Sequence, residues 1–506
     1  MKSLMFKGVL SLVTAALPSL AGAPPASARV RPATVAGSFY PGDAKELARV
    51  VDGLLARVTS PAVKGSLVAL VSPHAGYEYS GPVAASGYSL LRGRRFERVV
   101  VIAPSHVEAF GFSSVYGGDA YATPLGEIPV DKEFVTRLVA TKAARIAPQG
   151  HGVVNGRGEH AVEVQLPFLQ RTLGNFKLVP IVMGDPSYEA CRALGVALAN
   201  MIAVGPATLI VASSDLSHFH PYSAAVSLDG KTLRAIREWD YLSMSRNFDA
   251  QVWEACGGAP IIAAMIAAER LGAKEAQVLK YANSGDTAGD KSRVVGYGSV
   301  ALSKATAGQG VAAKPFTLGE REKKALLALA RKSVETAVRE RRLLALPLSD
   351  LPALREERGA FVTLQEKGEL RGCIGQVAAS KPLAATVLEV AAWAAMRDSR
   401  FRPVDVSELA DLDYEISVLS PLRRVTNIQD IQIGRDGLLM KNGPIEGLLL
   451  PQVPVEQHWD RATFLEETCR KAGLPPGCWK NPQTDVFAFT ALVFGDKEAS
   501  PQRGSR

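Results

Sequence analysis

Short apolar runs, rich in β-branched residues, recur through the first 300 residues and constrain the possible folds more than any other feature. They lie at 67–71, 99–103, 178–183 and 209–212. Stretches with helical periodicity, such as 44–58 and 159–173, alternate with them. Unbroken apolar runs of this kind are typical of parallel strands that are buried on both faces. The pattern therefore predicts an α/β fold with a mainly parallel sheet covered by helices.

The second half of the chain follows a segment of linker composition. Residues 303–314 are rich in glycine and alanine and hold no large apolar side chain. Beyond them come a helical pattern at 319–341, a turn at Lys367-Gly368 between two strand-like runs, and a helix that Pro382 opens. This order predicts a smaller α+β domain, and we expect the two halves to fold as separate cores.

The predicted segments are a signal peptide at 1–28, a first domain at 29–302, a linker at 303–317, a second domain at 318–497 and a tail at 498–506. The signal peptide is inferred from Lys2 and Lys7, an uncharged apolar stretch at 8–17, and small residues at 26–28. It predicts a periplasmic or secreted protein; a start that lies too far upstream would instead leave a cytoplasmic one. No other segment approaches 18 apolar residues, so we expect no membrane span in the mature chain.

Composition excludes several classes of protein. Hydrophobic residues make up 47% of the 506 residues and charged residues 21%, which excludes a disordered, collagen-like or coiled-coil chain. The 58 basic and 50 acidic residues leave a net charge of +8, and no dense basic block carries interleaved aromatic residues. We therefore expect no nucleic-acid partner. Five cysteines, an odd number, exclude a disulfide scaffold and leave at least some free thiols.

Three histidines follow directly after predicted strands. His74 follows the run at 67–71, His106 follows the run at 99–103, and Asp215 and His218 follow the run at 209–212. Loops that follow parallel strands emerge at one edge of the sheet, so these side chains are expected to converge there. Neutral imidazole is a common metal ligand, and an anionic ligand beside it completes an open catalytic site. Taken singly, each of these histidines is more often an ordinary loop residue.

Two further segments are candidates for the same site. Cys256 precedes an apolar helix that Pro260 opens, and the positive end of a helix favours a thiolate, so Cys256 could supply the anionic ligand; a lone cysteine is more often a small core residue. Glu159 and Glu163 are one helical turn apart with His160 at the predicted helix start. They either belong to the site or complement the helix dipole.

Several of these motifs together resemble the Memo family in order and spacing, over about residues 31–302. They are Gly37-Ser38-Phe39-Tyr40-Pro41, Pro73-His74-Ala75-Gly76-Tyr77, Pro104-Ser105-His106, Glu159-His160, Glu163-Val164-Gln165-Leu166-Pro167, Ser214-Asp215-Leu216-Ser217-His218 and Cys256-Gly257. The resemblance implies a fold similar to that of class III extradiol dioxygenases, which hold Fe(II) with two histidines and a carboxylate.

The resemblance also implies roles for individual residues. His74, His106 and Cys256 look like the metal ligands, and Asp215 and His218 look like the nearby polar pair that serves as catalytic acid or base. A thiolate here replaces the carboxylate of the dioxygenases. This softer ligand favours Fe(II), Cu or Zn over Mg or Ca, and Fe(II) is the metal that the resemblance favours.

Leu370-Arg371-Gly372-Cys373-Ile374-Gly375 is the sharpest local feature of the second half. Arg371 would lower the pKa of Cys373 if the two lay close, and the alternative is a buried structural cysteine. With Phe401-Arg402-Pro403-Val404 and Glu415-Ile416-Ser417-Val418-Leu419-Ser420-Pro421, it resembles the AMMECR-type domain over about residues 318–494. Memo-type and AMMECR-type proteins are also found beside a radical SAM protein, as AmmeMemoRadiSam systems. The cysteine triplet of radical SAM proteins is absent from this sequence, so that partner would be a separate protein.

Two functions follow from these features. The first is a metal-dependent, dioxygenase-like redox enzyme with a small-molecule or peptide substrate, which the AMMECR-like half shapes or delivers. The second is a non-catalytic scaffold that binds a peptide or a metal without turnover. A redox enzyme depends on its metal, whereas a scaffold keeps its binding after metal removal.

Overall fold

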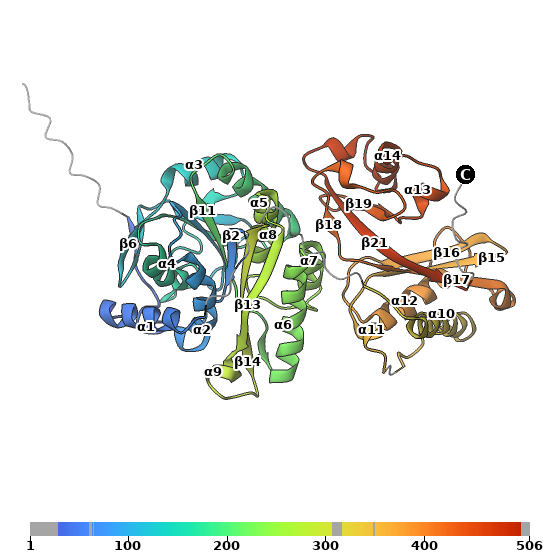
Figure 1. Ribbon diagram of the computed structural model, residues 1–506, viewed down its shortest axis with the longest axis horizontal. Helices are drawn as coiled ribbons and strands as arrows, with labels where there is room; N and C mark the ends of the chain where they lie inside the picture. Colours follow the sequence, from blue (N-terminus) through green and yellow to red (C-terminus); the bar gives the residue numbers. More distant parts are fainter. Residues whose placement is uncertain (1–28, 60–62, 64, 306–315, 348–349, 497–506) are drawn as a thin grey trace, which may run out of the picture.

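The structure, a computed structural model, describes residues 29–59, 63, 65–305, 316–347 and 350–496. Its two halves lie side by side along the longest axis of the molecule (Figure 1). The predicted signal peptide, residues 306–315 of the predicted linker and the predicted tail lie outside the described residues. Within the described part, no helix combines the length and the apolar composition that crossing a bilayer requires.

A nine-stranded sheet forms the centre of the first half. Its four inner strands are parallel neighbours in the order β2 (Ser66–Ser72), β11 (Thr208–Ser213), β3 (Arg98–Pro104) and β10 (Lys177–Met183). These strands are the four apolar runs of the sequence, and almost all of their side chains are buried. Because they are parallel, the loops after β2, β3 and β11 emerge at the same edge of the sheet.

The sheet as a whole is mixed rather than mainly parallel, which corrects the expectation from the sequence. β14 (Val294–Lys304) pairs antiparallel with β2, with β13 (Glu275–Asn283) and with β12 (His218–His220). On the opposite side, β4 (Ser113–Val115) pairs antiparallel with β10 and parallel with β7 (Arg145–Ile146). Only a short connection with α9 (Ser284–Thr287) joins β13 to β14, and strands joined so closely run antiparallel.

Helices cover both faces of this sheet. Figure 1 shows α1 (Ala44–Ala56), α2 (Tyr77–Tyr88) and α4 (Leu166–Leu173) on one side, and α5 (Tyr188–Ile202) and α8 (Gly258–Arg270) on the other. α8 is buried along most of its length because it packs against α5 and against β2, β3 and β11. α6 (Tyr222–Arg237) and α7 (Tyr241–Asp249) lie beside the second half. The remaining elements are β1 (Val30–Arg31), β5 (Ala120–Thr123), β6 (Gly126–Pro129), β8 (Val153–Val154), β9 (Arg157–Gly158), α3 (Lys132–Ala140), η1 (Ser89–Leu91) and η2 (Glu163–Gln165).

The second half is built on a seven-stranded antiparallel sheet with helices, an α+β arrangement. Its strands follow the order β16 (Glu369–Gln376), β15 (Ala360–Glu366), β17 (Leu412–Leu419), β21 (Asp485–Gly495), β19 (Asp436–Asn442) and β20 (Ile445–Leu449), and β18 (Arg423–Arg424) pairs with β21. The predicted turn is confirmed: Lys367 and Gly368 have φ values of 54° and 88°, as a two-residue hairpin turn requires.

Both helices expected in the second half are present. α10 (Glu320–Glu340) and α12 (Leu383–Met396) pack together, and α12 also contacts β15 and β16. Smaller elements are α11 (Pro352–Arg355), η3 (Val406–Asp411), η4 (Ile428–Asp430), α13 (Val453–Glu456), α14 (Arg461–Lys471) and η5 (Cys478–Lys480).

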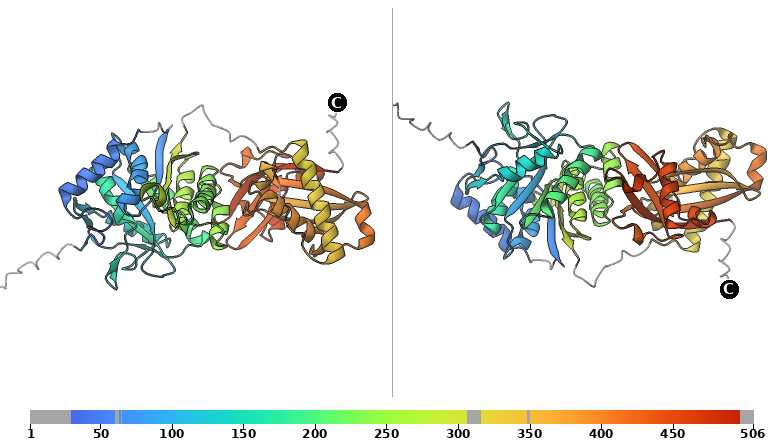
Figure 2. Two further views of the ribbon diagram at one scale, coloured as in Figure 1. Left: turned by 90° about the horizontal axis from the view of Figure 1, so that it is seen from below. Right: turned by 90° about the horizontal axis from the view of Figure 1, so that it is seen from above.

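The two halves share a hydrophobic cluster, so the expectation of separate cores is wrong at this face. Figure 2 shows helices of the first half against strands of the second. Six apolar residues of the second half belong to the core cluster of the first: Leu419, Leu422, Leu439, Leu450, Phe487 and Phe489. Successive side chains of a strand point to opposite faces. β19 and β21 therefore direct Leu438 and Val486 towards the α14 cluster, and Leu439 and Phe487 towards the first half.

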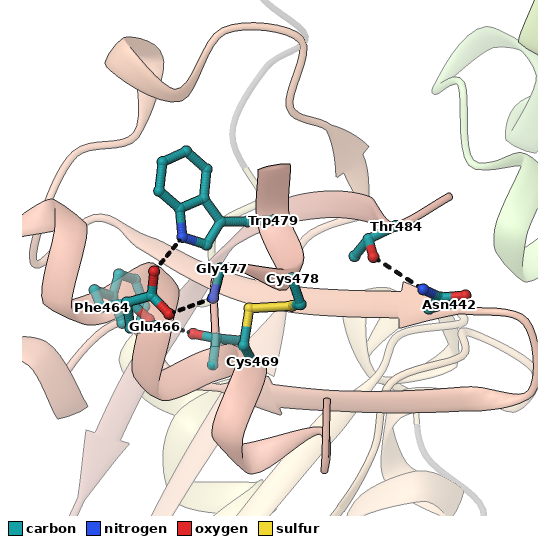
Figure 3. The surroundings of a disulfide bond; sticks show 9 residues. Asn442, Phe464, Glu466, Cys469, Gly477, Cys478, Trp479 and Thr484 are labelled. Carbon is teal, nitrogen blue, oxygen red and sulfur yellow. Dashed lines mark hydrogen bonds between the residues drawn. A yellow bond between two sulfur atoms is a disulfide. The ribbon is translucent and has the colours of Figure 1, made fainter. Parts of the chain in front are cut away.

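A disulfide between Cys469 and Cys478 joins α14 to η5 (Figure 3). Beside it, the Glu466 carboxylate accepts hydrogen bonds from the backbone N–H of Gly477, at 2.7 Å, and from the indole N–H of Trp479, at 2.9 Å. The same turn is thus held by one covalent bond and two hydrogen bonds. The other three cysteines of the chain, Cys191, Cys256 and Cys373, are free.

One buried carboxylate, that of Asp485 in β21, lies at the centre of the contact between the halves. Its oxygens accept from Arg192 Nε at 2.5 Å, from Arg270 at 3.2 Å and from Arg424 Nε at 3.4 Å. The Tyr188 hydroxyl donates to it as well, at 3.2 Å. Because Arg192, Arg270 and Tyr188 belong to the first half, Asp485 fixes the orientation of one half relative to the other.

We expect Asp485→Asn to destabilise the protein strongly, because it removes the charge that three guanidinium groups share. Loss of one partner of a buried ion pair costs about 3–5 kcal/mol. The measurement is urea unfolding followed by circular dichroism. Glu446→Gln is the matched control: Glu446 pairs with Arg246 across the same interface, but its side chain is 39% exposed. Its loss should stay below about 1 kcal/mol, and equal losses for the two variants would contradict the central place of Asp485.

Candidate metal centre

His74 lies in the loop after β2, and its imidazole is fixed in one tautomer. The side chain is buried, and Nδ1 lies 2.9 Å from the hydroxyl oxygen of Ser213. Ser213 uses its single hydroxyl hydrogen to bond the Ala161 carbonyl at 2.6 Å, so it accepts from His74 Nδ1–H. The other nitrogen, Nε2, therefore carries a free lone pair. It lies 3.1 Å from Cys256 Sγ.

His106 lies in the loop after β3 and is held by a buried carboxylate. Glu159 accepts from the His106 backbone N–H at 2.5 Å and from Nδ1 at 3.0 Å. Burial alone would raise the pKa of Glu159, but opposing effects, of which the hydrogen bond from the His106 ring is the largest, lower that pKa to about 2. Since an ionised carboxylate only accepts, His106 Nδ1 carries the proton and Nε2 is left free as a ligand atom.

Cys256 lies directly before α8, in a turn that requires glycine. A Cβ at Gly257 would lie 2.2 Å from the Ser213 carbonyl oxygen, so only glycine lets the turn approach β11 this closely. Burial, with a smaller effect from the Asp215 charge, raises the pKa of Cys256 well above its ordinary value. The expectation of a thiolate at the helix start is therefore wrong for the protein alone. A bound cation would reverse this balance, because metals bind the thiolate form.

The structure brings these three side chains together as predicted. One ligand atom from each of His74, His106 and Cys256 lies within 4.8 Å of the other two. The expected convergence at the edge of the parallel strands is thus confirmed, while metal binding itself stays a prediction. Two imidazole nitrogens and a sulfur, with both tautomers already set, form a donor set suited to Fe(II), Cu or Zn.

Asp215 lies against this group, and His218 lies farther along the same loop. Asp215 accepts from the His74 backbone N–H at 2.8 Å, and its Oδ2 lies 4.0 Å from His74 Nε2. Burial raises the pKa of Asp215 to about 7. His218 begins β12, and its backbone N–H donates to Glu254 at 3.3 Å. Burial lowers the pKa of His218. Within the described residues, no hydrogen bond links its imidazole to the three ligand candidates.

The predicted helix at 159–173 begins later than expected, and its two glutamates have separate roles. α4 starts at Leu166, after a 3₁₀ turn, because the Glu159 carboxylate turns back to His106 and to the Ala161 N–H. Glu163 is buried under the N-terminal segment, where it accepts from Arg31, from the Thr34 and Val35 N–H groups and from the Tyr40 hydroxyl. Glu163 therefore anchors that segment and does not face the three ligand candidates.

His160 does lie beside the ligand candidates His74 and His106. Its ring centroid is 4.7 Å from that of His106 and 5.4 Å from that of His74. His106, Glu159 and His160 form a second group with ligand atoms within 4.8 Å. Because Glu159 already accepts from His106 and Ala161, we assign it to holding His106. Burial lowers the pKa of His160 to about 4, so its ring is neutral at physiological pH.

In the second half, Arg371 does not act on Cys373, which corrects the sequence-based interpretation. Its guanidinium pairs with Glu408 at 2.8 and 3.0 Å. Arg400 is the nearby cation, and it donates to the Cys373 carbonyl at 3.2 Å. Burial nevertheless raises the pKa of Cys373. A Cβ at Gly372 would lie 2.3 Å from the Ala394 carbonyl, so that glycine permits close packing on α12.

Comparison with known proteins agrees with the motifs of the first half. A family model described as Memo-like protein matches residues 31–301. The chain belongs to the Memo family. A MEMO1 family protein of Methanopyrus kandleri is 34% identical over 280 residues, which cover 53% of this chain and 98% of that protein. The metal-centre candidates of the first half thus lie within a Memo domain.

A second family model, AMMECR1, matches residues 327–494. A protein of Methanothermobacter thermautotrophicus is 46% identical over 184 residues, which cover 35% of this chain and 95% of that protein. A crystal structure of an uncharacterized protein from Pyrococcus horikoshii shares 39% identity with a TM-score of 0.35, covering 36% of this chain and 95% of that one. The two family matches show that the chain is a fusion of a Memo domain and an AMMECR1 domain.

Beside Cys256, the Memo domain has a cleft of about 470 Å³. Met183, Phe248 and Ile262 contribute apolar surface, and Glu108 and Asp249 contribute carboxylates. No lysine or arginine lines the cleft among the described residues. A substrate could approach the sulfur through this cleft. Its two carboxylates, with no basic residue beside them, favour a neutral or cationic molecule over a strongly anionic one.

Two residues that orient His74 were not among the site residues predicted from the sequence. Ser213 and Gln165 form a buried network with His74, in which Gln165 Nε2 donates to Ser213 Oγ at 2.8 Å. Gln165 belongs to the motif that begins at Glu163, and Ser213 directly precedes the motif that contains Asp215. This proximity in the sequence was the available signal. Their function depends on contacts between segments about 50 residues apart, which a reading along the chain does not reveal.

The labelling of Cys373 by iodoacetamide tests which arginine governs its thiol. We expect Arg400→Gln to slow the reaction at pH 8 roughly threefold, since loss of a nearby positive charge raises the thiol pKa further. Arg371→Gln should leave the rate unchanged. Cys191, which is fully buried, should stay unlabelled in the folded protein. A slower reaction only in Arg371→Gln would restore the interpretation from the sequence.

Proposed function

We propose that the Memo domain is a metal-dependent redox enzyme of a dioxygenase-like kind, with the metal held by His74, His106 and Cys256. The observation that supports this most is the way both imidazoles are held. In each, Nδ1 donates to a buried acceptor, so that Nε2 keeps its lone pair in a group that includes a thiol within 4.8 Å. Metal-binding histidines are held in this way by neighbouring acceptors.

The donor set fits the metals named above. Neutral imidazole and thiolate suit Fe(II), Cu and Zn, whereas Mg and Ca prefer oxygen ligands. Fe(II) is the first candidate, and Cu or Zn are the alternatives. When bound, Fe(II) or copper would supply redox chemistry that amino-acid side chains lack.

The protein's own groups would position the substrate and move a proton. Asp215 Oδ2, 4.0 Å from His74 Nε2, is placed to hold or release a proton beside the ligand group. His218, from the same loop, is the second candidate acid or base. The cleft beside Cys256 would admit a small molecule or a peptide side chain and exclude part of the solvent.

We further propose that the protein works in an AmmeMemoRadiSam-type system with a separate radical SAM protein. The presence of Memo and AMMECR1 domains in one chain supports this. In this arrangement the AMMECR1 domain shapes or delivers the substrate. α7, which contributes Phe248 and Asp249 to the cleft, also carries Arg246, which pairs with Glu446 of the AMMECR1 domain at 2.7 Å.

Metal analysis of protein purified under anaerobic conditions tests the enzyme proposal. We expect about one Fe, Cu or Zn ion per chain and oxygen consumption that a chelator abolishes. Cys256→Ala should lose most of the metal while circular dichroism stays unchanged, because only one ligand is removed. Cys373→Ala is the matched control and should keep full metal content.

Equal metal content in Cys256→Ala and Cys373→Ala would reject the ligand set. If metal removal left peptide binding intact and no oxygen consumption could be found in the metal-loaded protein, the non-catalytic scaffold would be the better description.

We also propose that the protein is exported to the periplasm or secreted. The signal-peptide pattern at 1–28 supports this, and so does the Cys469–Cys478 disulfide, since structural disulfides are rare in the cytosol. A radical SAM partner in the cytoplasm would then meet only chains that have not been exported.

N-terminal sequencing of the protein from its host tests export. We expect the mature chain to begin just after Ala28, following the small residues at 26–28. Thiol titration of the denatured protein should find three reactive cysteines before reduction and five after it. A chain that still carries residues 2–28 and reacts through all five thiols would place it in the cytoplasm.

A further inference from the structure

The segment between β9 and η2 places a further imidazole, that of His160, beside two of the ligand candidates. Its ring stacks on that of His106, with the planes 28° apart and the centroids separated by 4.7 Å. It meets the His74 ring edge to face, at 87° and 5.4 Å. The Phe39 ring packs on it as well, with the centroids 4.7 Å apart. Contacts with three other rings therefore restrict where the His160 imidazole can lie.

His160 is a neighbour of the ligand group and not a member of it. His74, His106 and Cys256 form one group of ligand atoms, whereas His160 is grouped with His106 and Glu159. Its Nδ1 lies 3.6 Å from Glu159 Oε1, which is too far for a hydrogen bond. A cation held by the three ligand candidates would therefore have the His160 ring beside it.

Neither ring nitrogen of His160 has a hydrogen-bond partner among the residues that the structure describes. The side chain is 18% exposed, so a small molecule can reach it. An imidazole carries at least one N–H in either protonation state. Water can satisfy this donor in the absence of a ligand, so its significance lies in its place beside the ligand group.

The contact with Glu159 indicates which nitrogen faces the ligand group. The Nδ1 atoms of His106 and His160 lie 3.0 and 3.6 Å from the same atom, Glu159 Oε1. In His106 the other nitrogen, Nε2, is the free ligand atom. Because the two rings are stacked, we expect Nε2 of His160 to lie on the same side, away from Glu159 and towards the cation.

A molecule bound to the cation would come within reach of this nitrogen. A metal–ligand bond of about 2 Å and a hydrogen bond of about 2.9 Å together span at most about 5 Å. The His160 ring centroid lies at comparable distances, 4.7 and 5.4 Å, from the two rings that would hold the cation. His160 does not line the cleft beside Cys256, so it would meet such a molecule from another side than a substrate in the cleft.

We propose that His160 donates a hydrogen bond to a small ligand on the cation, and that it thereby favours ligands with an acceptor atom at or next to the metal-bound atom. Diatomic molecules and small linear or bent anions belong to this class. This inference rests on the proposed metal site, and it adds to that site a residue that selects what binds there.

Azide titration of the cobalt-loaded protein under anaerobic conditions, followed by the visible absorption of Co(II), tests the proposal. Co(II) accepts the same nitrogen and sulfur ligands as Fe(II) and Zn. His160→Phe keeps the ring packing and removes both nitrogens. We expect it to weaken azide binding about tenfold, because a hydrogen bond to a charged group is lost. Its cobalt content should match that of the unmodified protein. His160→Gln keeps an N–H near the position of Nε2 and should recover part of the affinity.

His220→Phe is the matched control, because Nε2 of His220 in β12 already pairs with Glu254 at 2.9 Å. It should bind azide as the unmodified protein does. Equal azide affinity in His160→Phe and the unmodified protein would overturn the assignment. A loss of cobalt in His160→Phe as large as in Cys256→Ala would overturn it as well, since His160 would then be a ligand. An unmodified protein that takes up no cobalt would instead reject the metal site itself, and this proposal with it.

Discussion

The parallel alignment of β2, β3 and β11 is the constraint on which the candidate metal centre depends. Parallel neighbours end at the same edge of a sheet, so the loops that carry His74, His106 and Asp215 leave it side by side. These residues are separated by up to 141 positions in the sequence. α8 then packs against the same three strands and places Cys256, just before its first turn, against His74. No single segment contains the site, and its geometry follows from strand register.

Buried hydrogen-bond acceptors turn this convergence into a donor set. Ser213 and Glu159 each take the Nδ1–H of one histidine. Without them, each ring could rotate or exchange its tautomer, and the ligand atoms would not be fixed before a metal arrives. Glu159 is buried and still ionised because His106 compensates for its desolvation. Two buried acceptors thus orient the two imidazole rings. Histidines that only packed in the core would not require such acceptors.

The sequence was sufficient for the features that rest on local patterns and insufficient for those that rest on contacts. The four inner strands, α10, α12 and the Lys367-Gly368 turn follow from apolar runs, periodicity and turn chemistry. β13 and β14 were missed because neither holds an apolar run longer than three residues: polar residues interrupt β13, and Gly296, Gly298 and Ser299 interrupt β14. The pairing of Arg371 with Glu408, and that of Cys469 with Cys478, depends on tertiary approach and leaves no local signal. The start of α4 was misplaced because Glu159 bonds across the site rather than along a helix.

The contact between the two domains bears on how the fusion would work. α7 lies between the cleft and the AMMECR1 domain. Phe248 and Asp249 line the cleft, while Tyr241 meets Phe487 edge to face and Arg246 pairs with Glu446. A shift of the AMMECR1 domain would therefore move a wall of the cleft. The buried Asp485 cluster opposes such a shift, because separating the domains would leave its carboxylate and the arginines of the first half without partners. The two domains are consequently expected to hold the cleft in one shape, rather than to act as independent modules on a tether.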